Sequence, residues 1–113
     1  MAITVQQLFG PVVLATAPSY TVIYSMPTTP TTYTLKNGRI RLTNTSGTTV
    51  AVGLWAGPAA TASTVANCFL MPYALGPSES LEVDIPTLTA GDTLRGQGAN
   101  VTAFEMGGVL HYT

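Results

Sequence analysis

Apolar and polar residues alternate with a period of two along several short stretches of the chain, which is typical of half-buried β-strands. The clearest stretch runs from Leu81 to Ile85, where apolar residues alternate with Glu82 and Asp84. We expect its apolar side chains to face a core and its two carboxylates to face solvent.

Two more stretches alternate in the same way. In one, Ile40 and Leu42 alternate with arginine and threonine, and in the other every second residue from Val50 to Leu54 is apolar. The alternation therefore predicts a core that contains Ile40, Leu42, Val50, Val52, Leu54, Leu81, Val83 and Ile85.

Glycine and proline interrupt the chain every eight to twelve residues, a spacing typical of short strands joined by turns. The Asn37-Gly38 pair is the strongest hairpin signal, and we expect it to join strands at 33–36 and 39–43. Further turns are predicted at 44–47, 74–78 and 90–92, and loops at 27–32 and 57–67.

The other predicted strands lie at 3–8, 12–15, 20–26, 50–55, 68–73 and 93–98, with the strand at 68–73 closed by Pro72. Residues 101–112 form either two strands or one strand bent at Gly107-Gly108. About eight short strands predict an all-β, single-domain antiparallel β-sandwich over residues 1–113, with jelly-roll or immunoglobulin-like connections. Residues 1–9 are expected to form an extended N-terminal arm or an edge strand.

The composition is unusual in its charge. Hydrophobic residues make up 46% of the 113 residues, but charged residues make up only 8%, and residues 1–35 and 42–78 carry no charge. Since interfaces are depleted of charge, this composition favours a protein whose surface is covered by other subunits. The alternative is a neutral surface kept in solution by threonine hydroxyls.

Charge also argues against two kinds of partner. Lys36, Arg39 and Arg41 form the only basic cluster, and the net charge is −1, so no nucleic-acid partner is expected. The N-terminus lacks the basic region of a signal peptide, and glutamine, glycine and proline interrupt its apolar run. We therefore expect no membrane partner and synthesis in the cytoplasm.

The sequence offers little for catalysis. Its single histidine, His111, and single cysteine, Cys68, do not supply a nucleophile held against a base or a set of metal ligands. Cys68 is expected to be a reduced thiol packed in the protein. We accordingly predict that the chain is not an enzyme, with no catalytic residue, no cofactor-binding residue, no metal site and no cofactor.

Aromatic residues are the remaining candidates for a binding site. In a small β-domain they form core or subunit contacts more often than a ligand groove. The residues considered are Tyr20, Tyr24, Tyr33, Trp55, Phe69, Tyr73, Phe104 and Tyr112.

Four segments in order carry a resemblance: GPVVLATAPSYTVIYSMP, LKNGRIRLTNTSGTTVAVGLWAG, PAATASTVAN and GPSESLEVDIPTLTAGDTLRGQGANVTAFEMGGVL. Their order and spacing resemble those of small structural proteins of bacteriophage particles. The chain departs from that pattern at Met26-Pro27 and in a Thr-Pro-Thr-Thr insertion. The resemblance implies a β-sandwich virion subunit without an enzymatic role.

Three functions follow as hypotheses. The first is a capsid decoration or cement protein on the head surface of the virion, a homo-oligomer such as a trimer that binds the major capsid protein. The second is a component of the neck, tail tip or fibre base. The third, of another class, is a glycan-binding adhesion module that uses Trp55 and exposed tyrosines.

Overall fold

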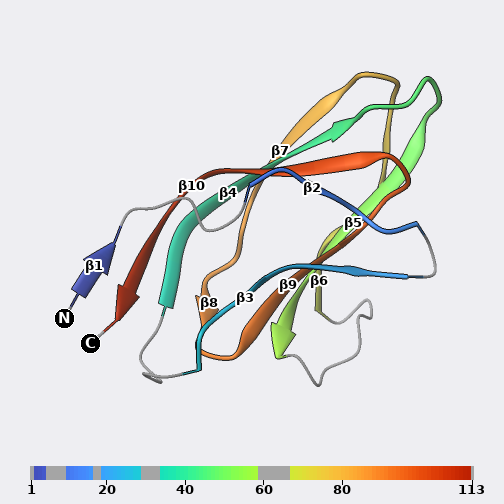
Figure 1. The fold of residues 1–113 in the computed structure, drawn as a ribbon. Helices are drawn as coiled ribbons and strands as arrows, with labels where there is room; N and C mark the ends of the chain where they lie inside the picture. The colour runs from blue at the N-terminus through green and yellow to red at the C-terminus, as the bar shows by residue number, and fades with distance from the viewer. Residues whose placement is uncertain (1, 5–9, 17–18, 29–33, 59–66, 113) are drawn as a thin grey trace.

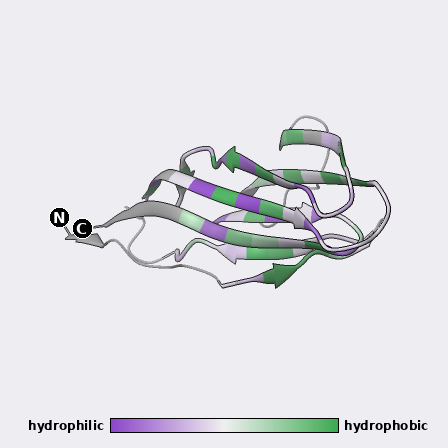
Figure 2. Ribbon diagram, turned by 90° about the horizontal axis from the view of Figure 1, so that it is seen from above, coloured by the Kyte–Doolittle hydropathy of each residue, from purple (hydrophilic) through white to green (hydrophobic). Residues whose placement is uncertain are grey.

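A computed structural model describes residues 2–4, 10–16, 19–28, 34–58 and 67–112, which form two antiparallel sheets packed face to face (Figures 1 and 2). The strands are β1 (Ala2–Thr4), β2 (Val12–Val13), β3 (Thr21–Ser25), β4 (Thr34–Asn44), β5 (Val50–Pro58), β6 (Cys68–Leu75), β7 (Ser80–Asp84), β8 (Leu88–Thr89), β9 (Asp92–Gln97) and β10 (Val101–Tyr112). The predicted all-β sandwich is confirmed.

The order of strands resolves the connections that the sequence left open. Sheet A has the order β1-β10-β4-β7, with β2 also beside β10 and β8 beside β4, and sheet B has the order β3-β9-β5-β6. Without the short strands β1 and β8, the two sheets read 2-10-4-7 and 3-9-5-6. This interleaving of two Greek keys is the jelly-roll arrangement, which differs from the ABED and CFG sheets of an immunoglobulin domain.

The core lies between the inner faces of the two sheets. Ile40 and Leu42 of β4 and Val52 and Leu54 of β5 are fully buried, as their alternation predicts, and Ile85 is buried beside them. The other predicted core residues, Val50, Leu81 and Val83, are half-buried and pack against this cluster. Figure 2 shows hydrophobic and hydrophilic residues alternating along the strands.

The predicted hairpin at Asn37-Gly38 is wrong, because β4 passes through both residues without turning. The first half of β4 pairs with β8 and its second half with β7. Between these partners, the backbone N–H of Ile85 donates to the carbonyl of Gly38 at 2.7 Å, and a Cβ on Gly38 would lie 3.2 Å from Ile85. Gly38 therefore serves a close approach of two chain segments rather than a turn.

Two strands differ from their predicted limits. Strand β6 does not close at Pro72 but continues to Leu75, and its register on β5 shifts across Pro72. An edge strand tolerates this, because a proline there removes no N–H from a ladder on its open side. Residues 101–112 form one strand, with register shifts on both sides of Gly107, so the bent-strand alternative is confirmed.

The N-terminal prediction is resolved in part. Ala2–Thr4 pairs with the end of β10, in the register Ala2↔Tyr112, so this segment is an edge strand and the two chain ends lie side by side (Figure 1). Residues 5–9 of the predicted arm lie outside the described residues. Strand β8, which the sequence analysis did not identify, adds a short partner to β4.

The predicted turn after β4 is held together by Asn44, which is fully buried. Its Nδ2 donates to the carbonyls of Thr48, Leu75 and Gly76 at 2.8, 2.9 and 3.1 Å. Its Oδ1 accepts hydrogen bonds from the backbone N–H and the hydroxyl of Ser46. One side chain thus joins the end of sheet A to the turn that follows β6 in sheet B.

Candidate interaction surface

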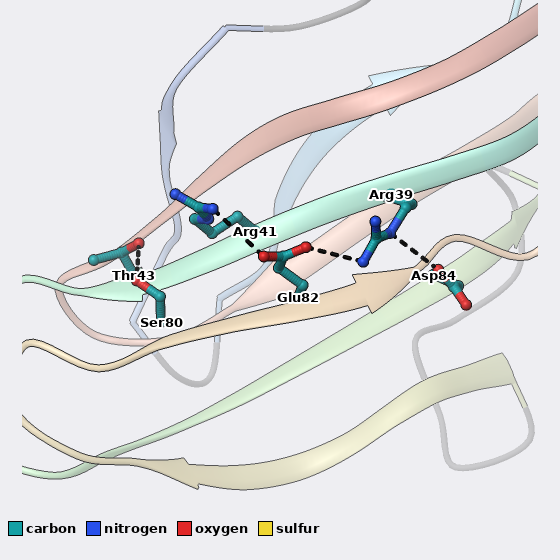
Figure 3. A network of polar contacts seen from close by, with 6 residues as sticks. All are labelled: Arg39, Arg41, Thr43, Ser80, Glu82 and Asp84. Atoms are coloured by element: carbon teal, nitrogen blue, oxygen red, sulfur yellow. Dashed lines mark hydrogen bonds and ion pairs between the residues drawn. The ribbon is translucent and has the colours of Figure 1, made fainter.

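The outer face of sheet A carries four charged side chains, which we call the charged strip: Arg39, Arg41, Glu82 and Asp84. They point outward because the residues between them on β4 and β7 point into the core. Arg39 contacts Glu82 at 2.9 Å and Asp84 at 3.4 Å, and Arg41 contacts Glu82 at 3.4 Å (Figure 3). Both arginines of the predicted basic cluster are thus neutralised by the acidic residues predicted to face solvent.

The charged strip contributes little to stability. All its members are partly exposed, and exposed ion pairs are worth about 0.2–1 kcal/mol each. Next to the charged strip on the same two strands, a hydrogen bond of 2.9 Å joins the hydroxyls of Thr43 and Ser80 (Figure 3). The consequence of the strip is electrostatic, since four of the nine charges of the chain cancel within one pair of strands.

Beside the charged strip, the same face exposes three apolar side chains, which we call the apolar row: Val13, Phe104 and Met106. Their exposed fractions are 67%, 39% and 40%. Phe104 lies opposite Arg41 and Thr102 lies opposite Val13, so the row follows β2 and β10 alongside the strip. Exposed apolar residues gathered next to a neutral polar area are typical of protein contact surfaces.

The apolar row arises from a reversed pattern on β10. Val101 and Ala103 face the core, and so does the buried Glu105, while Phe104 faces outward and Met106, at the register shift that follows Glu105, is exposed too. A carboxylate therefore points inward where an apolar side chain is usual. Phe104 was predicted to be a core or subunit contact, whereas Met106 and Val13 were not predicted. The inward position of Glu105 next to Phe104 could have indicated that apolar side chains face outward here.

The outer face of sheet B differs at its interior strand β5, where the large side chain is buried, whereas Val22 on β3 and Tyr73 on β6, the two marginal strands, are 54% and 48% exposed. Trp55 is only 6% exposed although it lies outside the central core cluster. A Cβ on Gly53 would lie 2.7 Å from Cη2 of Trp55, so the indole lies over that glycine. The ring of Tyr20 meets the indole edge-on, with ring centroids 4.9 Å apart.

The predicted aromatic candidates do not gather at one place among the residues described. Tyr24 and Phe69 pack against the core, Tyr73 is exposed on β6, and Phe104 lies on the opposite sheet from Trp55. Tyr33 and the side chain of Tyr112 are outside the described part. No aromatic groove is formed by the described side chains.

Hollows that open at the surface of the described residues include the following two. One, of about 300 Å³, lies at the end of the sandwich between β5, β6 and β8, and includes Cys68, Phe69 and Asp92. The other, of about 400 Å³, lies where β7 leaves β4, and includes Gly38 and Asp84. Across the described residues, no three histidine, cysteine or acidic side chains are placed to hold a metal ion.

Cys68 is half-buried, and its Sγ donates to the carbonyl of Leu70 at 2.8 Å. Burial raises the pKa of this thiol above its ordinary value, against the opposite effect of hydrogen bonds with the backbone of Leu70 and Leu54. A raised pKa keeps the thiol protonated at neutral pH, which disfavours nucleophilic chemistry. The backbone of His111 lies at the end of β10, and its side chain is outside the description.

Within the described segments, no helix is long and apolar enough to cross a membrane. The described residues thus form a jelly-roll sandwich that carries the apolar row beside the charged strip on the outer face of sheet A. No protein-family model matches the chain, and neither the curated proteins nor the solved structures compared with it include a match.

Proposed function

We propose that the chain is a structural subunit of a bacteriophage virion, and specifically a decoration or cement protein that binds the major capsid protein on the head surface. The observation that carries the proposal is the apolar row beside the charged strip, because it offers exposed apolar area without unpaired charge. The low charge of the whole chain supports it too.

The fold supports the same proposal as an analogy. Viral capsid domains use jelly rolls, but so do lectins and cupins, so the architecture alone does not choose among them. Copies of a decoration protein each bury a modest area, about 800 Å² per partner for an ordinary interface, and the sum over a lattice reinforces the shell. Self-association, as a trimer for example, belongs to this proposal.

The glycan-binding alternative loses its main residue, Trp55, and among the described residues keeps only the exposed tyrosines Tyr20 and Tyr73. Stacking on a sugar requires an open aromatic face, and Trp55 is buried with Tyr20 against its ring. No feature favours the neck, tail tip or fibre base over the head either. We therefore keep the decoration protein as the proposal and let the number of copies decide its position.

The first experiment is to count copies of the chain per purified particle by quantitative mass spectrometry against the major capsid protein. Hundreds of copies would support decoration. A few to a few tens would move the protein to the neck, tail tip or fibre base, and absence from particles would overturn the virion proposal.

A second experiment tests the surface itself. Phe104→Asp places a carboxylate in the apolar row, and we expect it to weaken binding to particles that lack the protein at least ten-fold. Thr49→Asp, an exposed change just before β5, is the control that should bind as the unaltered chain does. Equal binding by the unaltered chain and Phe104→Asp would contradict the assignment of this surface.

A further inference from the structure

Strand β7 forms one margin of sheet A, with β4 on one side and no strand of this sheet beyond it in the described part (Figure 1). Two backbone hydrogen bonds fix its orientation: Ile85 N–H donates to Gly38, and the Asn44 N–H donates to Glu79. In an antiparallel pair, hydrogen-bonded residues alternate with residues whose backbone groups point away. The N–H and C=O groups of Ser80, Glu82 and Asp84 therefore point to the open edge.

The inner side of β7 is also incompletely covered. Leu81 and Val83 are only half-buried, whereas Leu42 and Ile40, their partners on β4, are fully buried. The apolar surface of sheet A thus continues to the margin. An additional strand at this edge would cover these two side chains as well as pair three residues of backbone.

The charges at the edge indicate what such a strand would carry. Asp84 is the most exposed member of the charged strip, with 89% of its side chain accessible and one of its oxygens 3.4 Å from Nε of Arg39. Across the sheet, basic β4 is followed by acidic β7. A third strand that continues this alternation would place a basic residue opposite Asp84, where opposite charges are favourable.

The same charges argue against a second copy as the occupant. If β7 paired with β7 of a copy about Glu82, two glutamates would lie directly opposite each other, which is destabilising. Charged residues on edge strands commonly prevent this kind of self-pairing. The edge is therefore better suited to a different polypeptide.

We propose that the open edge of β7 binds an extended segment of another protein as an additional antiparallel strand of sheet A. The segment carries Lys or Arg on the side of Glu82 and Asp84 and apolar residues on the side of Leu81 and Val83. This mode of binding combines backbone hydrogen bonds with alternate side-chain contacts. It goes beyond the proposed function and is independent of it, because it uses the sheet margin rather than the apolar row.

The test uses the full chain labelled with ¹⁵N and the blocked peptide Thr-Val-Lys-Val-Lys-Val-Thr. With peptide at ten times its Kd, we expect amide hydrogen exchange at Ser80, Glu82 and Asp84 to slow about ten-fold. The matched peptide with Glu in place of Lys should bind at least five-fold more weakly.

Variants at Asp84 separate the backbone from the charge. Asp84→Ala keeps the outward N–H and removes the carboxylate, and Asp84→Pro removes both, so we expect Asp84→Pro to bind the Lys peptide about five-fold more weakly than Asp84→Ala. Asp84→Lys should abolish the preference for the Lys peptide, because Glu82 and the new lysine then act in opposite directions. Circular dichroism verifies the fold of each variant, and Asp84→Lys alone tests the proposal if Asp84→Pro does not fold.

Three results would overturn the proposal. The first is equal binding of the Lys and Glu peptides. The second is a peptide effect confined to the amides of Phe104 and Met106. The third is slowed exchange at Ser80, Glu82 and Asp84 in the chain alone as its concentration rises, which would identify a second copy as the occupant.

Discussion

The interior strands of the two sheets, β5 and β10, treat large outward side chains in opposite ways. On sheet B, Trp55 lies over Gly53 and is nearly inaccessible, although it points away from the core. On sheet A, Phe104 of β10 lies opposite Arg41, and Phe104 and Met106 each keep about two-fifths of their surface exposed. The outward packing of β5 is completed within the chain, and that of β10 is not, although Val22 and Tyr73 at the margins of sheet B are exposed as well.

The difference follows from where glycine occurs. Strand β5 places Gly53 and Gly57 on either side of Trp55, and the guanidinium of Arg95 also comes near Gly57, at 3.7 Å from the position of a Cβ. Each long side chain can therefore lie flat on the sheet. Beside Phe104, the cross-strand neighbour is Arg41, whose side chain already reaches toward Glu82. Whether an outward aromatic residue is exposed or buried therefore depends on its neighbours on the sheet.

The largest difference in stability between the two faces is expected when one aromatic side chain is removed from each. Trp55→Ala should lower the free energy of unfolding by about 3–5 kcal/mol, because it deletes a buried indole. Phe104→Ala should cost under about 1 kcal/mol, since its ring is partly solvated. Denaturant unfolding measures both, and equal losses would show that the two faces are packed alike.

The next effect tests the glycine that lets the indole lie flat. Gly53→Ala would place a Cβ 2.7 Å from Cη2 of Trp55, and we expect a loss of about 1–3 kcal/mol from the displaced ring. Gly47→Ala is the matched control, because no atom lies within 4 Å of its new Cβ and its backbone is not left-handed. If Gly53→Ala left both the free energy of unfolding and the Trp55 fluorescence unchanged, the indole would not lie over Gly53 as described.

A smaller effect is expected from the charged strip. In a double-mutant cycle of Arg39→Ala and Glu82→Ala, we expect a coupling of at most about 1 kcal/mol that declines as salt is added. A coupling above 2 kcal/mol, or one insensitive to salt, would mean that the strip is a structural element of sheet A rather than a neutral surface.

The alternation of residues predicted the sandwich and most of its core, because local periodicity determines which side of a strand is apolar. It could not decide the jelly-roll order, which depends on pairings between strands far apart in sequence, such as β2 with β10. Asn37-Gly38 has the composition of a hairpin turn, yet the approach of Ile85 gives Gly38 another role. Only the contact between Gly38 and Ile85 distinguishes a glycine at a close approach from a glycine in a turn.

The candidate surface was predictable in part. The alternation placed Glu82 and Asp84 outward, and charge alone suggested a covered surface. Register was needed to bring Arg39 beside these carboxylates, and to place Val13 near Phe104 on one face. The burial of Trp55 was not visible either, because its outward position on β5 predicts exposure unless the role of Gly53 is known.

The smallest effect concerns a thiol on each face. Cys68 lies opposite Trp55 on sheet B, and burial raises its pKa above the ordinary value of a thiol. Val13→Cys, made in a Cys68→Ser background, places a thiol at the most exposed position of the apolar row. We expect iodoacetamide at pH 8 to modify this new thiol about ten-fold faster than Cys68 of the unaltered chain, because the thiolate is the reacting form.

The pH dependence of the modification rate should differ between the two thiols. Since burial raises the pKa of Cys68, its rate of modification should go on rising with pH after the rate of the thiol at position 13 has levelled off. For the same reason, the fold accommodates the protonated thiol better than the thiolate, and the free energy of unfolding should fall as the pH rises toward the folded pKa of Cys68. Equal rates for the two thiols at pH 8 would mean that the outer face of sheet B is as open as that of sheet A.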